Sequence, residues 1–315
     1  MLLTIKCIGS KFVWNLNLAA WGFYSSMAYT TALASFSQPS HIDSSLLRCK
    51  VVSVADRFEV FEQHGIPAHL RVLFGLEPDR RYVTREVFVA ELRVLTEAEK
   101  QALIRLLYVT ADEVYLQPSE LNSLKDSVVK VLKRQAGFAG ELAAKLMVSY
   151  DDVHTDLVWR DYCIQHLADL YRQDPANSEI QQVLLRASKE RSGNLAATAL
   201  LAIRKNVSSG FTQEVLLQRA FALAADATYS DTVRLTALQV CAELGDIRVL
   251  PLAREINRSQ SSIHLRMSAI AVLGRLGEVH DHELIKQYVL SSDTRLRTAA
   301  KAALELLNQR FATVE

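Results

Sequence analysis

Residues 231–246 read DTVRLTALQVCAELGD, and residues 264–277 read HLRMSAIAVLGRLG. In each stretch an arginine is followed by an alanine three positions later and by a further core-type side chain seven positions later. Offsets of three, four and seven residues lie on one face of an α-helix. The two stretches therefore predict equivalent helices that bury the same face.

The same register recurs through the C-terminal half of the chain, at steps of about 36, 38, 32 and 31 residues. The reference column is Arg160, Ala196, Arg234, Arg266 and Arg297. Three residues later stand the small side chains Cys163, Ala199, Ala237, Ala269 and Ala300, and seven later stand Leu167, Ile203, Cys241, Leu273 and Leu304. Small residues let a neighbouring helix approach, and the larger apolar ones fill the space between repeats. This periodicity is typical of helical hairpin repeats.

Second helices and their boundaries complete the hairpins. Second helices are expected at 179–188, 212–225, 248–257 and 281–290. Glycines 193, 210, 245 and 277 are expected to end helices, and Asp231 and Asp293 to cap helix starts.

The region before the repeats is less regular. Helices are expected at 119–134 and 141–148, and Thr96 with Glu99 forms a capping box. Residues 84–95 have helical periodicity, although β-branched and aromatic residues at 51–54 and 82–89 also allow short strands.

The run 231–246 followed by Pro251, with residues 264–277 and 293–307, resembles HEAT and HEAT-like repeats. The resemblance implies an all-α fold, a right-handed α-solenoid whose concave face is lined by the second helix of each repeat. It also implies a hydrogen-bonded ladder between repeats, formed by Asp231, Arg234, Arg266, Asp293 and Arg297. An anion-binding stripe is the functional alternative for the arginines. We expect the array over residues 150–315, preceded by an irregular, mainly helical region over 41–149.

Composition excludes several classes of protein. The 315 residues include only 11 Gly and 6 Pro, which argues against a turn-rich all-β fold. Lys and Arg number 36 against 35 Asp and Glu, so no overall positive field attracts nucleic acid.

Residues 1–34 have a different composition, with Lys6 and Lys11 as the charges and ALA at 32–34. This pattern fits a secretory signal cleaved after Ala34. If the leader is cleaved, the protein would be exported to the periplasm or the medium and would keep no transmembrane span. If it is not cleaved, we expect a cytoplasmic protein. Polar residues interrupt the apolar run at Asn15, Asn17, Ser25, Ser26, Thr30 and Thr31. A start codon assigned too far upstream and an uncleaved amphipathic anchor explain these interruptions equally well.

Three clusters carry residue types suited to chemistry, and each also has a structural interpretation. Asp151, Asp152, His154 and Asp156 lack the glycine and terminal glutamate of an EF-hand, which favours a capping turn over a calcium site. His280 and His282 are two residues apart, so they point to different sides of a helix. Cys163 and His166 could pair on one helix, but Cys163 belongs to a core column.

A basic run, Lys125, Lys130, Lys133 and Arg134, is expected to form a solvated face balanced by Glu120 and Asp126. The sequence contains no phosphate loop, CxxC, HExxH or GxSxG motif, and we assign no catalytic, cofactor or metal residues.

These observations predict a non-catalytic scaffold that binds a protein or peptide on its helical-repeat surface. Trp159, Tyr162 and Arg266 are the expected partner-binding anchors, because aromatic and arginine side chains dominate binding energy. The alternatives are a HEAT-like enzyme, of the bilin-lyase or DNA-glycosylase type, and a structural component of a bacterial envelope.

Overall fold

A computed structural model describes residues 61–63, 65–67, 70, 94–114 and 116–312 of the chain. The chain divides into two compact units, Met1–Val51 and Val52–Glu315, and all described residues belong to the second. The leader-like segment 1–34, the strands considered at 51–54 and 82–89, and most of the helix considered at 84–95 lie outside the described residues.

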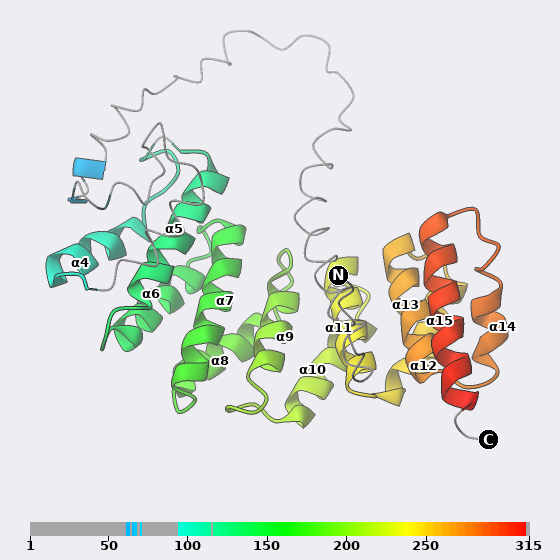
Figure 1. Ribbon diagram of the computed structural model, residues 1–315. Helices are drawn as coiled ribbons and strands as arrows, with labels where there is room; N and C mark the ends of the chain where they lie inside the picture. The colour runs from blue at the N-terminus through cyan, green and yellow to red at the C-terminus, as the bar shows by residue number, and fades with distance from the viewer. Residues whose placement is uncertain (1–60, 64, 68–69, 71–93, 115, 313–315) are drawn as a thin grey trace, which may run out of the picture. The chain divides into compact units, whose positions relative to one another are not determined.

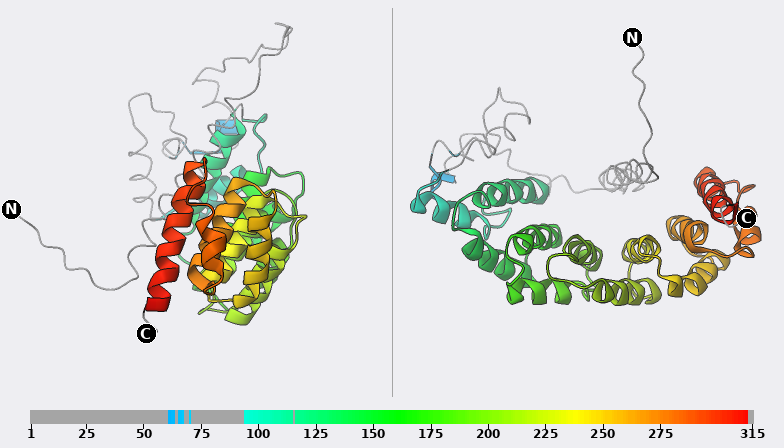
Figure 2. Two further views of the ribbon diagram at one scale, coloured as in Figure 1. Left: turned by 90° about the vertical axis from the view of Figure 1, so that its right-hand side faces the viewer. Right: turned by 60° about the horizontal axis from the view of Figure 1, so that its bottom comes forward.

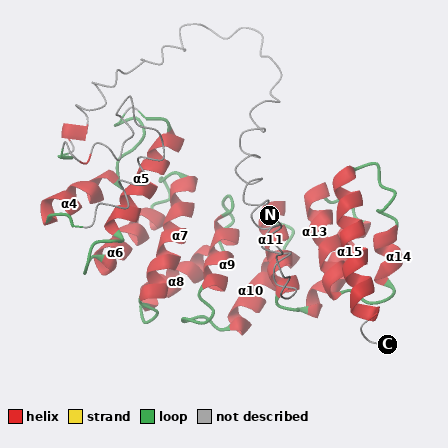
Figure 3. Cartoon of the chain, viewed as in Figure 1, coloured by secondary structure: helices red, strands yellow, loops and turns green. Residues whose placement is uncertain are grey.

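The described residues are helical throughout, with no strand among them (Figures 1 and 3). One series of helices, the first series, carries the reference column and its equivalents: α5 (Pro118–Leu132), α7 (Leu157–Gln173), α9 (Leu195–Lys205), α11 (Asp231–Glu243), α13 (Ile263–Leu276) and α15 (Thr294–Ala312). The second series alternates with it: α6 (Ala139–Asp151), α8 (Ser178–Ala187), α10 (Gln213–Ala225), α12 (Leu250–Arg258) and α14 (Asp281–Lys286). Helix α4 (Glu97–Leu106) precedes them, and a 3₁₀ turn, η2 (Ile247–Val249), leads into α12. The all-α fold of consecutive helical hairpins is confirmed.

Within this unit the two series pack differently. Each first-series helix contacts the next, from α5 through α7, α9, α11 and α13 to α15. Second-series helices pack chiefly on the first-series helices that precede and follow them, so the two series form two rows (Figure 2). The interface between repeats is therefore built mainly by the first series.

Burial confirms the predicted register. Every member of the small column, from Cys163 to Ala300, is fully buried. The column four residues later is equally buried from Leu167 to Leu273, whereas Leu304 on α15 is only partly buried against the core. Helix α15 follows α13 with no later helix of the series beside it in the described chain, which leaves Leu304 with fewer neighbours.

Local sequence explains the helix boundaries. Thr96 caps α4 in the predicted capping box, with its backbone N–H donating to the Glu99 carboxylate at 2.7 Å. After α11, Gly245 adopts φ of 76°, a left-handed conformation that glycine reaches without steric cost. This turn lets the Asp246 N–H donate to the Cys241 carbonyl at 2.9 Å, which satisfies a carbonyl at the helix end.

Several boundary predictions were wrong. Gly193 and Gly210 do not end helices, because α8 already ends at Ala187 and α9 at Lys205, and both glycines lie in the following loops. Ser230, not Asp231, caps α11, because the Ser230 hydroxyl accepts a hydrogen bond from the Val233 N–H while Asp231 already lies in the first turn. The helix expected at 281–290 ends at Lys286. Beyond it Leu290 is 91 % exposed, so its side chain does not pack on the core and does not stabilise a further helical turn.

Helices α13 and α15 approach each other closely at Gly274. A Cβ added at Gly274 would lie 2.6 Å from the Ala303 Cα, far inside van der Waals contact. Because the obstacle is backbone, neither helix can yield without separating.

We expect Gly274→Ala to destabilise the fold by about 1–3 kcal/mol, since overpacking outweighs the helix-propensity gain of up to about 1 kcal/mol. Urea unfolding followed by circular dichroism measures the change. Gly140→Ala on α6 is the control, because a Cβ there meets nothing within 4 Å. A Gly274→Ala protein as stable as the Gly140→Ala protein would contradict this packing.

Candidate functional site

Three arginines of the reference column donate hydrogen bonds to backbone carbonyls within their own hairpins. Arg160 Nε donates to the Tyr150 carbonyl at 2.8 Å, and Arg234 Nε donates to the Ala224 carbonyl at 3.2 Å. Arg297 donates to the Ser291 carbonyl at 2.7 Å. Each arginine thus satisfies a carbonyl at or beyond the end of the preceding second-series helix, which otherwise lacks a helical partner.

The remaining residues of the expected ladder also make local contacts. Asp293 accepts hydrogen bonds from the Arg295 and Leu296 amides and pairs with the Arg295 side chain, so it caps α15. Asp231 is exposed, and the half-buried Arg266 has a buried Nε without an acceptor in the described chain. Among the described residues, no hydrogen bond or ion pair links Asp231 or Asp293 to an arginine of the next repeat.

A different ladder joins neighbouring repeats, at the C-terminal ends of the first-series helices. Lys133 Nζ lies 2.9 Å from Asp169 Oδ2, and Lys205 Nζ lies 2.6 Å from Asp169 Oδ1. Arg204 pairs with Glu243 at 2.7 Å, and Arg275 donates to the Glu243 backbone carbonyl at 3.3 Å. Ion pairs therefore link consecutive helices from α5 to α11, and a hydrogen bond from Arg275 to a backbone carbonyl continues the series to α13; we call these contacts the charge ladder.

The sequence contained the signal for this ladder. Nine residues after the reference column stand Asp169, Lys205, Glu243 and Arg275, whose charges alternate along the repeats. Lys133 takes the same place on α5, where Ser127 and Val131 fill the small and apolar positions of the column. Cations at helix C-termini also interact favourably with the helix dipole.

Asp169 is the most heavily paired carboxylate of the ladder. Arg172, one turn along α7, contacts it at 3.0 Å in addition to the two lysines. Burial by itself would raise the pKa of Asp169, but hydrogen bonds from Lys205 and Lys133 outweigh burial and lower the pKa to about 2. The ionised carboxylate is therefore favoured by the folded state.

Asp169→Asn should lower the free energy of unfolding by about 1–2 kcal/mol at neutral pH, a value reduced for the partial exposure of the pair. A carboxylate with a depressed folded-state pKa contributes fully above its unfolded pKa, near 3.8, and loses that contribution as the pH falls through about 2. The difference between wild type and variant should therefore close between pH 4 and pH 2, measured by urea unfolding across pH. Asp174→Asn, which removes an exposed carboxylate just beyond α7, is the control. A pH-independent difference would show that the ladder contributes no electrostatic stability.

The expected partner-binding anchors occupy three different environments. Trp159 is fully buried in the core, so its ring is not accessible to a partner on this surface. Tyr162 is partly buried, with its ring centroid 6.5 Å from that of Trp159. Arg266 is half-buried on α13.

The acidic cluster at 151–156 is a capping turn. Asp156 accepts hydrogen bonds from the Val158 and Trp159 amides at the start of α7 and from the Asn122 side chain at 2.7 Å. Asp152 accepts from the His154 N–H and the Thr155 hydroxyl, and Asp151 pairs with an arginine of α8 at 2.7 Å. The carboxylates are engaged with separate partners and do not form a common calcium-binding cage.

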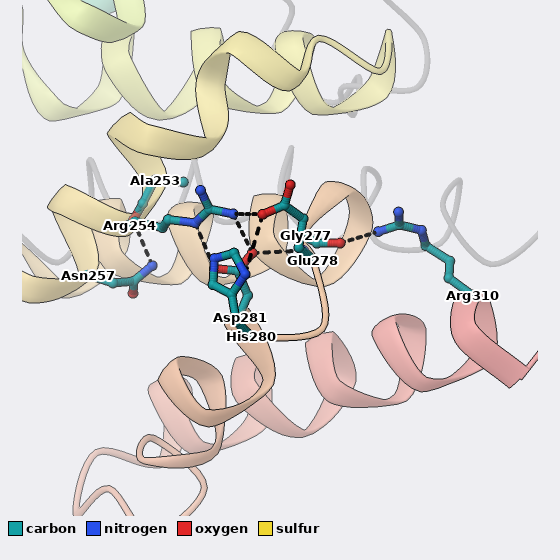
Figure 4. Close-up of polar contacts among 8 residues, drawn as sticks. All are labelled: Ala253, Arg254, Asn257, Gly277, Glu278, His280, Asp281 and Arg310. Atoms are coloured by element: carbon teal, nitrogen blue, oxygen red, sulfur yellow. Dashed lines mark hydrogen bonds and ion pairs between the residues drawn. The ribbon is translucent and has the colours of Figure 1, made fainter.

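The histidine cluster surrounds Arg254, which lies on α12, the preceding helix of the second series. Glu278, His280 and Asp281 place one ligand-type atom each within 4.8 Å of one another, whereas His282 pairs with Glu283 instead. Arg254 from α12 donates from Nε to Asp281 Oδ1 and from Nη2 to Glu278 Oε2, both at 2.8 Å (Figure 4).

Because of Arg254, this cluster favours an ion pair over a metal. Asp281 is 1 % exposed; burial would raise its pKa, but hydrogen bonds from Arg254 and from the Glu278 amide lower it overall. A divalent cation between the two carboxylates would have to displace the guanidinium. The cluster joins α12 to the start of α14.

Cys163 and His166 do not form a catalytic pair. Cys163 is fully buried, and burial raises the pKa of its thiol, which disfavours the nucleophilic thiolate. Burial lowers the pKa of His166, and its Nε2 lies 3.2 Å from Asp126 Oδ1 on α5, a contact that only partly offsets burial. His166 therefore joins α7 to α5.

The basic run on α5 is divided between surface and core. Lys130 pairs with Asp126 at 2.8 Å and Lys133 belongs to the charge ladder. Lys125 is only 6 % exposed, so its assignment to a solvated face was wrong. It lies on the core side of α5, where its Nζ is 5.4 Å from the centroid of the Trp159 ring.

Comparisons with known proteins add little to this geometry. No family model and no curated protein matches the sequence. A designed armadillo repeat protein matches at 15 % identity over 70 % of this chain and 99 % of its own, with a TM-score of 0.37. Human deoxyhypusine hydroxylase, in complex with glycerol, matches at 12 % identity over 80 % of this chain and 98 % of its own, with a TM-score of 0.32. Likenesses of this size carry no argument about function.

Among the helices that the structure describes, none combines the length and the apolar composition that a bilayer-spanning segment requires.

Proposed function

We propose that the chain is a non-catalytic scaffold that binds a protein or peptide on the solvent-facing side of its first-series helices. One observation carries the proposal: the clusters suited to chemistry are engaged in internal contacts, as Arg254 holds Glu278 and Asp281 and as Asp156 caps α7. The first-series helices in contrast offer a row of side chains that face solvent.

The row follows from the packing of the first series. Neighbouring helices contact the column positions three and seven residues after the arginine, and the second series covers a further side. On α7, α9, α11 and α13 most positions one, two and five residues after the reference column are at least partly exposed, although Ala197 and Ser268 are buried. The exposed and partly exposed positions include Tyr162, Leu201, Leu235 and Met267 on four consecutive helices, and we call these four residues the apolar strip.

The apolar strip has the composition of a binding surface. Leu201 is 43 % exposed, and the other three side chains are partly buried against the core, which holds them in place. The charge ladder lies farther along the same helices, toward their C-terminal ends. Fixed apolar side chains lose little conformational entropy on binding, and a charged rim is typical of protein interfaces.

The sequence alone predicted a binding surface lined by the second helix of each repeat, with Trp159 as an anchor. The proposed surface lies on the first series, and the apolar strip takes the place of the buried Trp159. Export remains part of the proposal and depends on the leader-like composition of residues 1–34. No contact of the described residues favours a lyase or glycosylase reaction.

Affinity capture from the native host tests the proposal, with tagged full-length wild type beside a Leu201→Asp, Met267→Asp variant. A stoichiometric protein partner should be lost from the variant by at least tenfold, because a charge in each contact disrupts an apolar interface. Leu290→Asp, a change at a 91 % exposed side chain after α14, is the matched control and should retain the partner.

The same preparation reports the N-terminus by mass spectrometry, and a start at Ser35 would support export. A partner held equally by wild type and the strip variant would place binding elsewhere. Co-purification of nucleic acid or a small molecule in place of a protein would favour the enzyme alternative.

A further inference from the structure

Lys125 is the most unusual ionisable residue of the described chain. Its side chain is 6 % exposed on α5, and its Nζ lies over the fully buried Trp159 ring. No carboxylate of the described residues lies within ion-pair or hydrogen-bond distance of this Nζ. An aromatic face compensates only part of the cost of burying an ammonium group.

Other lysines of the described chain show what Lys125 lacks. Five of them lie within 4 Å of a carboxylate: Lys100, Lys130, Lys133, Lys205 and Lys286. Lys189 and Lys301 are exposed, where water solvates the charge. Lys125 has neither a paired carboxylate nor full solvation.

These surroundings favour the neutral amine. Burial lowers the pKa of Lys125 from 10.5 to about 8, although the carboxylates of Asp156 at α7 and Glu113 before α5 act in the opposite direction. Burial raises the pKa of Cys163, so the neighbouring thiol stays protonated and does not compete as a nucleophile. At pH 8 the neutral fraction of Lys125 exceeds that of an ordinary lysine by a factor on the order of one hundred.

We propose that Lys125 is a nucleophilic lysine that condenses through Nζ with small aldehydes. The Nζ lone pair attacks the carbonyl carbon, so that a C–N bond forms as the C=O π bond breaks, and a proton passes from Nζ to the carbonyl oxygen to give a carbinolamine. Loss of water from the carbinolamine leaves the imine. Burial beside apolar neighbours is the usual means of activating a lysine for this chemistry. The inference is independent of the proposed scaffold function and goes beyond it.

Competitive labelling of the full-length wild-type protein tests the inference. Limiting acetaldehyde, with cyanoborohydride to trap the imine as a secondary amine, is added at pH 8, and peptide mapping by mass spectrometry gives the rate at each lysine. We expect Lys125 to be ethylated at least tenfold faster than Lys189 and Lys301. Its rate should level off above about pH 8, while theirs continue to rise.

Two controls connect the selectivity to the folded structure. Labelling in guanidinium chloride should abolish the preference, because it depends on burial beside Trp159. Lys125→Arg, which keeps a cation over the ring but forms no imine under these conditions, should lose the fast-labelled peptide and retain the circular dichroism spectrum. Lys125 labelled no faster than Lys189 in the folded protein, or left unlabelled while the exposed lysines react to completion, would overturn the proposal.

Discussion

Close packing of small side chains between consecutive first-series helices is the constraint on which the rest of the structure depends. Cys163, Ala199, Ala237 and Ala269 are fully buried between neighbouring helices, and the larger residues four positions later fill the remaining space. At Gly274 even a methyl group has no room. With the helices held at this distance, side chains nine residues after the arginine column come within ion-pair reach of the next repeat.

The polar residues extend this arrangement. Arg160, Arg234 and Arg297 of the column bind carbonyls within their hairpins, and the charge ladder connects one repeat to the next. Arg254 performs a similar role between α12 and α14. Residue types that could serve catalysis or metal binding thus hold helices together, and the proposed binding surface is the solvent-facing row of the first series.

Much of the fold could be predicted from the sequence because small and large apolar side chains recur at fixed positions in each repeat. The columns beginning at Cys163 and Leu167 place the first-series helices correctly, and the capping box at Thr96 marks the start of α4. The charge ladder was harder to predict from the sequence. A contact between residues one repeat apart depends on how each helix is rotated about its axis, and the spacing of residues within one helix does not define that rotation. Lys125 shows the same limit, since it is buried while the next residue, Asp126, is partly exposed.

The candidate site was predicted less well than the fold. Trp159 has the residue type of a binding anchor, but it lies one position from the column arginine on the core side of α7. Whether an aromatic residue faces the core or solvent is decided by neighbouring helices, so the apolar strip could be recognised only after the helices were placed.

Native-state hydrogen exchange, resolved by mass spectrometry, tests most directly the claim that first-series packing holds the array together. Helices α7, α9, α11 and α13 have neighbours of their own series on both sides as well as second-series helices. We predict that their amides exchange more slowly than those of α8, α10 and α12, because they open only when the interface between repeats opens. Exchange in α9 and α11 as fast as in α8 and α10 would contradict a core built chiefly by the first series.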